Sequence, residues 1–365
     1  MKAGTNRSRP GKASSIVSVV FSRGVIATVL LAIAFSAGIP QAFAECKMVQ
    51  VGELPVRLIQ NKLIVDGEIN GQKLGVVLDT GLTFTLVKRS AVERLGLRRD
   101  RARGVRMFGI GGEIDLESTF VEELKIGQIA RKGRRTLVSS ENDLGDSVAV
   151  FLGEDFLRQV DVEFDLSHGV VRLFEPRDCS VASLAYWADH ASAIEIDAVD
   201  DARPQIRFTV RINGKPLRAL LDSGATVSVL DRPDASLLGV TPETPGVLAL
   251  GRSAGLGRKA VDYWIGPFQS FAIGDETIRN IAIVFGDVSR NLTYTAGGYA
   301  PRRVGGTAAM LLGADFLRSH RVLVANSQRK LYFTYSGGPV FGGAAPSRSE
   351  SVELEVDANP TAPQK

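Results

Sequence analysis

One segment of the chain occurs twice, and this duplication limits the possible folds more than any other feature. Residues 69–80 read INGQKLGVVLDT and residues 212–223 read INGKPLRALLDS, at an offset of 143 residues. Two later pairs align in the same order: FLGEDFLR (151–158) with LLGADFLR (311–318), and VRLF (171–174) with KLYF (330–333). A length of 365 residues leaves room for two such domains. We therefore expect one unit of roughly 110–130 residues to be present in two copies.

Each copy is expected to consist mainly of strands. An Asn-Gly pair stands between apolar runs at 70–71 and again at 213–214, and it favours a two-residue hairpin because both residues adopt positive φ. The runs GVVLD and RALLD that follow suit buried strands. Short helices are expected over 90–95 and directly after Gly153 and Gly313. The sequence thus predicts an all-β fold with few helices.

The two copies divide the chain into regions. We expect a leader, an N-terminal lobe, a connection between lobes, a C-terminal lobe and a tail, over residues 1–44, 45–178, 179–204, 205–335 and 336–365. The tail is rich in Gly, Pro, Ser and Glu and has few apolar residues, which is typical of a disordered segment.

The leader has the pattern of a signal peptide. Basic residues precede a 13-residue apolar run at 25–37, and Ala42-Phe43-Ala44 offers small residues for cleavage before Glu45. The apolar run is shorter than the roughly 20 residues that cross a bilayer as a helix. We therefore expect a periplasmic or secreted protein without stable membrane insertion after cleavage; an uncleaved anchor is the alternative.

Charge and cysteine content fit this expectation. All of the basic excess lies in the leader, since the rest of the chain has 39 basic and 40 acidic residues. Charge therefore gives no reason to expect a nucleic-acid partner. The two cysteines, Cys46 and Cys179, permit one disulfide in an oxidising compartment, whereas two buried free thiols are the alternative.

Both repeats carry the same short motif directly after an apolar strand. The two copies are Asp79-Thr80-Gly81 and Asp222-Ser223-Gly224. A single D-[ST]-G is readily explained as a turn, but two copies at equivalent repeat positions indicate a shared site. Two carboxyl groups about 3 Å apart share one proton near neutral pH, so one can activate a water while the other polarises a carbonyl group.

The motif residues beside the aspartates have expected supporting roles. The hydroxyl groups of Thr80 and Ser223 can form hydrogen bonds across the junction between the lobes. Gly81 and Gly224 allow the backbone to approach closely and to donate N–H groups to the carboxylates.

With these motifs, the sequence resembles the retropepsin family of aspartic proteases over roughly residues 56–335. VVLDTG and ALLDSGAT match its active-site strand and loop, and the FLGEDFL and LLGADFL segments resemble its later glycine motif and helix. The glycine-rich segment Gly109-Ile110-Gly111-Gly112 resembles its flap. Arg252 and Ser253 stand at the corresponding distance from Asp222, so Ser253 is expected at the second flap tip. Leu82 departs from the small residue usual after the first motif.

The resemblance implies two retropepsin-like acid-protease barrels in one bilobal chain, which would be a monomer with an internal pseudo-dimer. It implies an aspartic endopeptidase that hydrolyses peptide or protein substrates with water activated by Asp79 and Asp222. A non-catalytic peptide-binding module of the same fold is the alternative.

A minor alternative is a serine hydrolase that uses Ser253. The segment 251–255 fits G-x-S-x-G, and His320 follows in the appropriate order. That motif requires a helix directly after it, which the glycines here disfavour. Histidine and cysteine spacing predicts no metal site, and no phosphate-binding loop is present, so no cofactor is expected.

Overall fold

The computed structural model describes residues 45–139, 148–198, 204–294, 302–303 and 307–341. All of these belong to one compact unit that begins at Glu45. The expected leader lies outside the described residues, as does the tail after residue 341, so the signal peptide and the disorder of that tail stay predictions.

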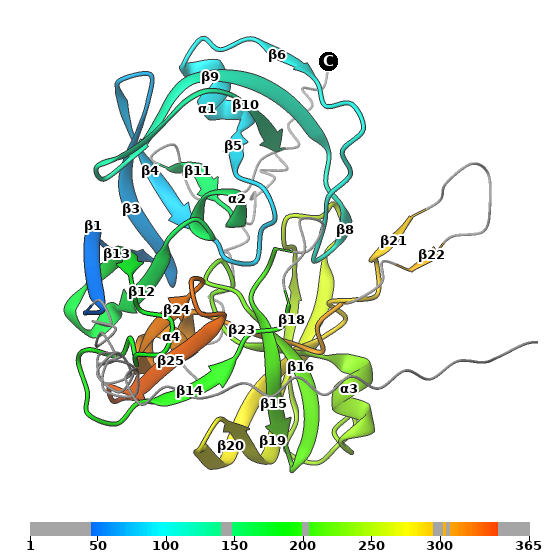
Figure 1. Ribbon diagram of the computed structural model, residues 1–365. Coiled ribbons are helices and arrows are strands. Elements are labelled where there is room, and N and C mark those ends of the chain that lie inside the picture. The colour runs from blue at the N-terminus through cyan, green and yellow to red at the C-terminus, as the bar shows by residue number, and fades with distance from the viewer. Residues whose placement is uncertain (1–44, 140–147, 199–203, 295–301, 304–306, 342–365) are drawn as a thin grey trace, which may run out of the picture. The chain divides into compact units, whose positions relative to one another are not determined.

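The first repeat forms a barrel of strands (Figure 1). Its sheet contains, in spatial order, β2 (Arg57–Ile59), β3 (Lys62–Ile69), β4 (Gln72–Leu78), β11 (Val148–Leu152), β5 (Leu86–Lys88), β10 (Ile129–Ser139), β9 (Leu116–Ile126) and β6 (Arg99–Arg101). Because β3 also pairs with β9, six of these strands form a closed ring.

The second repeat has the same strand order. Its sheet contains β15 (Arg207–Ile212), β16 (Lys215–Leu221), β23 (Met310–Leu312), β17 (Val229–Asp231), β20 (Glu276–Gly286), β19 (Val261–Ile273) and β18 (Leu248–Ser253). The pairing of β15 with β19 closes this ring. The prediction of an all-β fold with two barrels is therefore confirmed.

The Asn-Gly pairs form the predicted hairpin turns. Asn70 and Asn213 both have φ of 50°, and Gly71 and Gly214 both have φ of 77°. Two consecutive positive φ values give the turn that matches the twist of paired strands, so each pair sets the register of its hairpin.

A third sheet joins the two lobes. Its strands, in order, are β1 (Lys47–Pro55), β13 (Val170–Arg177), β12 (Asp161–Asp165), β24 (His320–Ala325), β25 (Lys330–Tyr335) and β14 (Ser192–Glu195). The central pair, β12 with β24, brings one strand from each repeat together (Figure 1). The edge strand β14 lies inside the segment expected to be only a connection, because its backbone extends the sheet beside β25.

One apolar core runs through both barrels and this sheet. The same cluster of buried side chains includes Leu78 of the first barrel, Leu221 of the second, and Val162 and Val324 of the shared sheet. Continuous burial of this kind makes independent opening of the lobes costly, since apolar area would be returned to water.

The helices are short. They are α1 (Arg89–Arg94), α2 (Glu154–Leu157), α3 (Arg232–Leu237) and α4 (Ala314–Ser319), with one turn of 3-10 helix at Leu166–His168. The helices expected near residue 90 and after both glycines are present, whereas α3 was not predicted. Pro233 stands in its first turn, where proline is tolerated because no N–H is needed there. None of the described helices has the length and apolar character needed to cross a bilayer.

Short strand pairs and the chain ends complete the described fold. Two-stranded sheets are formed by β7 (Phe108–Gly109) with β8 (Gly112–Glu113), and by β21 (Thr293–Tyr294) with β22 (Arg302–Arg303). Cys46 and Cys179 form a disulfide, which confirms the predicted bridge. The expectation of a disordered tail that begins at residue 336 is wrong for residues 336–341, because Val340 is buried and the Phe341 ring lies 4.9 Å from that of Phe271.

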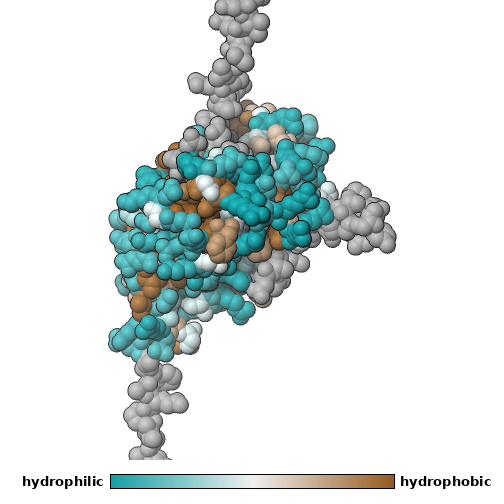
Figure 2. All heavy atoms as spheres, turned by 90° about the horizontal axis from the view of Figure 1, so that it is seen from above, coloured by the Kyte–Doolittle hydropathy of each residue, from teal (hydrophilic) through white to brown (hydrophobic). Residues whose placement is uncertain are grey.

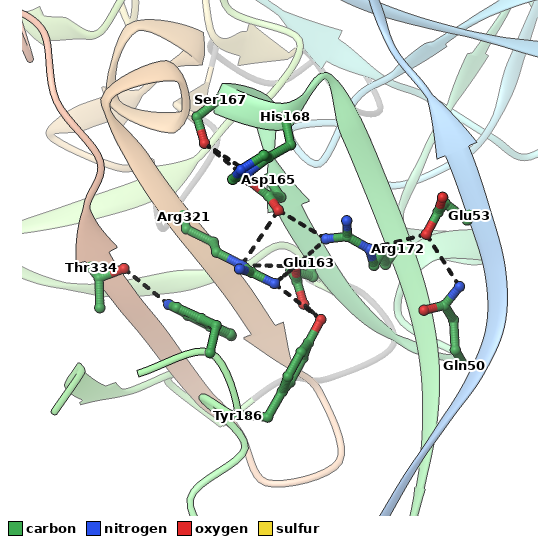
Figure 3. A network of polar contacts seen from close by, with 11 residues as sticks. Gln50, Glu53, Glu163, Asp165, Ser167, His168, Arg172, Tyr186, Arg321 and Thr334 are labelled. Carbon is green, nitrogen blue, oxygen red and sulfur yellow. Dashed lines mark hydrogen bonds and ion pairs between the residues drawn. The ribbon is translucent and has the colours of Figure 1, made fainter. Parts of the chain in front are cut away.

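A buried cluster of charges lies on the shared sheet (Figure 3). Glu163 on β12 is fully buried and accepts hydrogen bonds from Arg172 of the first repeat (2.8 Å) and from Arg321 of the second (2.7 Å). The hydroxyl of Tyr186 donates to the same carboxylate (2.6 Å). One glutamate thus links both repeats and the connecting segment.

The face of the molecule seen in Figure 2 is mainly hydrophilic, with hydrophobic residues gathered in small patches.

Candidate active site

The two motif aspartates stand at the ends of equivalent strands. Asp79 directly follows β4 and Asp222 directly follows β16. Each strand has a parallel neighbour whose last residue fixes the aspartate: the N–H of Asp79 donates to the Leu152 carbonyl (3.0 Å), and that of Asp222 to the Leu312 carbonyl (2.9 Å). The repeated fold therefore presents both carboxyl groups in the same way.

Hydrogen bonds between the two lobes connect the motif loops. The Thr80 hydroxyl donates to the Leu221 carbonyl (2.8 Å) and accepts from the Ser223 N–H (3.0 Å). In the reciprocal direction, the Ser223 hydroxyl donates to the Leu78 carbonyl (2.8 Å) and accepts from the Thr80 N–H (3.0 Å). Both side chains are buried, so four bonds shielded from water hold the loops together.

The motif glycines lie against the opposite aspartate. A Cβ atom on Gly81 would lie 2.5 Å from Asp222 Oδ1, and one on Gly224 would overlap the Asp79 carboxyl group. Each glycine also donates its N–H to the aspartate of its own motif, at 3.1 Å for Asp79 and 3.0 Å for Asp222. The N–H of Ala225 adds a further donor to Asp222 (3.1 Å). Any side chain at either glycine would push the two carboxyl groups apart.

The environment favours one shared proton. Burial, and then the charge of Asp222, raise the pKa of Asp79 to about 8. Burial also raises the pKa of Asp222, while Lys62 and the backbone N–H groups of the loop oppose that shift. Each aspartate lies against the glycine of the opposite motif, which places the two carboxyl groups next to each other. A pair of this kind titrates as a unit and holds one proton near neutral pH.

A second layer of aspartates supports the loops from behind. Asp155 in α2 accepts from the N–H (2.8 Å) and hydroxyl (2.7 Å) of Thr85. Asp315 in α4 accepts from the N–H (2.9 Å) and hydroxyl (2.6 Å) of Ser228. Sequence reasoning assigned no role to this pair, although the aspartate shared by GEDFLR and GADFLR was a visible signal.

Glu154 is a third carboxyl group close to the site. It begins α2, is fully buried, and neither of its carboxyl oxygens has a hydrogen-bond partner among the described residues. Burial raises its pKa well above the usual value; Arg158 opposes the shift and the charge of Asp79 adds to it. The second repeat has Ala314 at this position, and that difference between the aligned segments was the signal that sequence reasoning missed.

Two side chains cross between lobes beside the motif loops. Lys62 Nζ donates to the carbonyl of Gly224, and Gln205 Nε2 donates to the hydroxyl of Thr83 (2.8 Å). The repeat offset relates Lys62 to Gln205. Sequence reasoning singled out neither residue, because each contacts the lobe to which it does not belong.

The first flap is a hairpin whose turn meets the second lobe. Phe108 to Gly109 pairs with Gly112 to Glu113, which leaves Ile110 and Gly111 at the turn. Their carbonyls accept hydrogen bonds from the N–H groups of Gly257 (2.9 Å) and Lys259 (3.0 Å). The two flap tips are therefore in contact.

The second flap tip lies further along the chain than predicted. Arg252 and Ser253 are exposed and still belong to β18, where they pair with Asp262 and Val261 of β19. The hairpin strands continue past the position that the first repeat suggested, so the loop at 254–260 forms the tip. Ser253 is therefore a strand residue and not the tip residue expected.

This placement contradicts the serine hydrolase alternative. A strand pairing surrounds Ser253, in place of the strand-to-helix turn that the motif needs. His320 is buried and hydrogen-bonded to the Phe316 carbonyl (2.9 Å) and to Glu276 (3.1 Å). In the described part of the chain, no group of three or more His, Cys, Asp or Glu side chains could hold a metal ion.

Two six-stranded barrels that meet at paired D-[ST]-G loops define the acid-protease class of fold. Comparison with known proteins agrees: the family described as aspartyl protease matches residues 65–156 and 208–316, together more than half of the chain. The chain belongs to the aspartyl protease family, and the two matches correspond to its two retropepsin-like units.

One curated protein is similar over a shorter stretch. It is the UBA domain-containing protein Mud1 of Schizosaccharomyces pombe, 32% identical over 114 residues. The similarity covers 30% of this chain and 32% of Mud1, so the chain matches about a third of the length of that relative.

Proposed function

We propose that the protein is an aspartic endopeptidase in which Asp79 and Asp222 together activate one water molecule. The observation that carries the proposal is the pair of neighbouring carboxyl groups, each against the glycine of the opposite motif, in a junction held by reciprocal hydrogen bonds between Thr80 and Ser223. Membership of the aspartyl protease family supports it.

The chemistry follows from the single shared proton. The ionised carboxylate takes a proton from a water molecule as the water oxygen bonds to the carbonyl carbon of the scissile peptide. The protonated carboxyl group meanwhile donates its proton to the carbonyl oxygen. The tetrahedral intermediate then collapses as its carbon–nitrogen bond breaks. The nitrogen leaves with the proton that the first carboxyl group took from water, and the second carboxylate takes a proton from a hydroxyl of the intermediate, so one proton is again shared by the pair.

The flaps support this reaction by covering the peptide. Gly109, Ile110, Gly111 and Gly112 form a hairpin whose turn contacts the second flap tip, so opening and closing of this contact would admit substrate and then exclude water.

The proposal extends to assembly and location. A monomer is proposed because the continuous core and shared sheet join both motif loops within one chain. Export to the periplasm or outside the cell rests on the pattern of the leader, and the Cys46–Cys179 bridge is compatible with an oxidising compartment.

The test is hydrolysis of an unfolded protein between about pH 3 and pH 7, with and without a statine-type inhibitor. Mass spectrometry should identify new peptide termini, which the inhibitor and the variant Asp79→Asn should both prevent. Peptide binding without cleavage in the wild-type protein would instead support the peptide-binding module.

A further inference from the structure

Gly224 is in contact with three charged side chains at once. Its carbonyl accepts a hydrogen bond from Lys62 Nζ, its N–H donates to Asp222 Oδ1, and its Cα lies against the Asp79 carboxyl group. The ammonium group of Lys62 and the two carboxyl groups therefore all lie against the same residue, Gly224. Lys62 begins β3 of the first lobe, whereas Gly224 belongs to the second.

Other groups near the carboxyl pair do not supply this charge. The charges of Asp79 and Arg158 both act on Glu154, which begins α2. On the side of the second lobe, α4 begins with the apolar Ala314, and the Asp315 carboxylate is occupied by Ser228.

We propose that Lys62 is a positioning residue of the carboxyl pair, a role that rests on the proposed function. Its hydrogen bond holds the Gly224 loop against Asp79, and its positive charge stabilises the state in which one proton is shared. Burial raises the pKa of both aspartates, and the charge of Lys62 acts against that rise. The range of pH in which the pair holds one proton therefore lies lower than it would without Lys62.

A comparison with Gln205 distinguishes the effect of the Lys62 charge from the effect of a hydrogen bond between the lobes. It occupies the equivalent position in the second repeat and also donates a hydrogen bond across the junction, but it has no charge. Lys62→Gln consequently keeps a side chain that fits the corresponding position of the other repeat. Gln205→Met is the matched control, because it removes a bridge between the lobes without changing charge.

The experiment measures the titration of both aspartates directly. Carboxyl carbon NMR of aspartate-labelled protein, assigned with Asp79→Asn and Asp222→Asn, gives the apparent pKa values whether or not the protein cleaves peptides. Lys62→Gln should raise both values by about one unit, and both limbs of the pH profile of kcat/KM should move to higher pH by the same amount. Lys62→Arg keeps the positive charge and should have the wild-type pKa values. Gln205→Met should also leave these values unchanged.

Unchanged titration in Lys62→Gln would overturn the inference, as would an equal shift in Gln205→Met, which would indicate general loosening of the junction. Lys62→Met keeps the aliphatic stem and provides the same test if Lys62→Gln does not fold. Failure of the proposed function has a different signature: the wild-type protein would cleave no peptide, while the NMR titration would still show whether Lys62 acts on the pair.

Discussion

Asp79 and Glu154 are buried carboxyl groups whose charges act on each other, and both have raised pKa values. Between the pKa of the unfolded chain, about 4, and the higher pKa of the folded state, the native protein binds more protons than the unfolded one. The free energy of unfolding contributed by these groups is therefore fully present at low pH and falls as pH rises through this range. The proposed mechanism uses the proton on Asp79, whereas Glu154 has no part in it.

Glu154→Gln should therefore stabilise the protein at neutral and alkaline pH. Glutamine cannot ionise, so its burial has no cost that grows with pH. We expect the free energy of unfolding to rise by about 1–3 kcal/mol at about pH 8 and to change little at about pH 4. Urea unfolding at the two pH values measures this difference.

The matched control is Glu122→Gln, because Glu122 is exposed on β9. It should change stability equally little at both pH values. A Glu154→Gln variant that is destabilised to the same extent at both pH values would show that the carboxyl group is not kept neutral in the folded state.

Residue-scale prediction from sequence succeeded where the signal was local. Asp79 and Asp222 could be identified because each follows an apolar strand within a repeated motif. Lys62 and Gln205 could not, because their partners lie in the opposite lobe and depend on how the lobes meet. Glu154 was hidden because a charged residue after a glycine normally indicates an exposed helix start.

At the scale of elements, the flap hairpins depend on glycine for two separate reasons. Gly111 has φ of +94°, which disfavours any other residue, and a Cβ atom there would overlap the Lys259 carbonyl of the second tip. Gly104 has φ of +74°, but a Cβ atom there would meet nothing within 4 Å. Backbone strain alone can therefore be separated from loss of the contact between tips.

Gly111→Ala should lower kcat/KM by on the order of 10-fold or more, because the added methyl group pushes the two flap tips apart. Gly104→Ala should cost similar backbone strain, about 1 kcal/mol, and leave kcat/KM nearly unchanged. Steady-state kinetics on a peptide substrate, with thermal unfolding of both variants, measures each effect. Equal kinetics in the two variants would mean that the tip contact is not needed for turnover.

Element prediction was accurate for the first flap and displaced for the second. The glycine-rich segment at 109–112 marks its own turn, because glycine supplies the positive φ. The second flap was placed by analogy with the first repeat, but its strands β18 and β19 are longer, so the tip moved to 254–260. Insertions between repeats of this kind leave no periodic signal in the sequence.

At the scale of the whole molecule, the lobes depend on one buried glutamate in their shared sheet. Glu163→Gln would remove a charge that pairs with Arg172 and Arg321 in a site shielded from water, and Asp165 would remain as their buried carboxylate partner (Figure 3). We expect a loss of about 1–3 kcal/mol in the free energy of unfolding, less than the roughly 3–5 kcal/mol typical of a broken buried ion pair, because Asp165 still pairs with both arginines.

Asp66→Asn is the control for this prediction. Its carboxylate pairs with Arg57 at 2.8 Å but is 81% exposed, so its loss should cost no more than about 1 kcal/mol. Urea unfolding measures both variants. Similar losses in the two would show that the Glu163 cluster does not stabilise the junction between the lobes.

We propose that the two halves of one chain supply one carboxyl group each to a single active site. The two halves are covalently linked in one chain, and the pairing of β12 with β24 and the hydrogen bonds between Thr80 and Ser223 hold them together. Such linkage raises the effective concentration of one half near the other to about millimolar or more. Pairing within the chain is therefore favoured over pairing between chains.

The most direct measurement is peptide hydrolysis by Asp79→Asn and Asp222→Asn, each alone and then mixed in equal amounts. We expect each variant to be inactive, with a loss of about 100-fold or more, and we expect mixing to restore no activity. If each variant alone kept half of the wild-type activity, like halves would pair between chains, because each dimer would retain one intact site. Partial recovery on mixing would indicate that unlike halves pair between chains, and either result would contradict a site built within one chain.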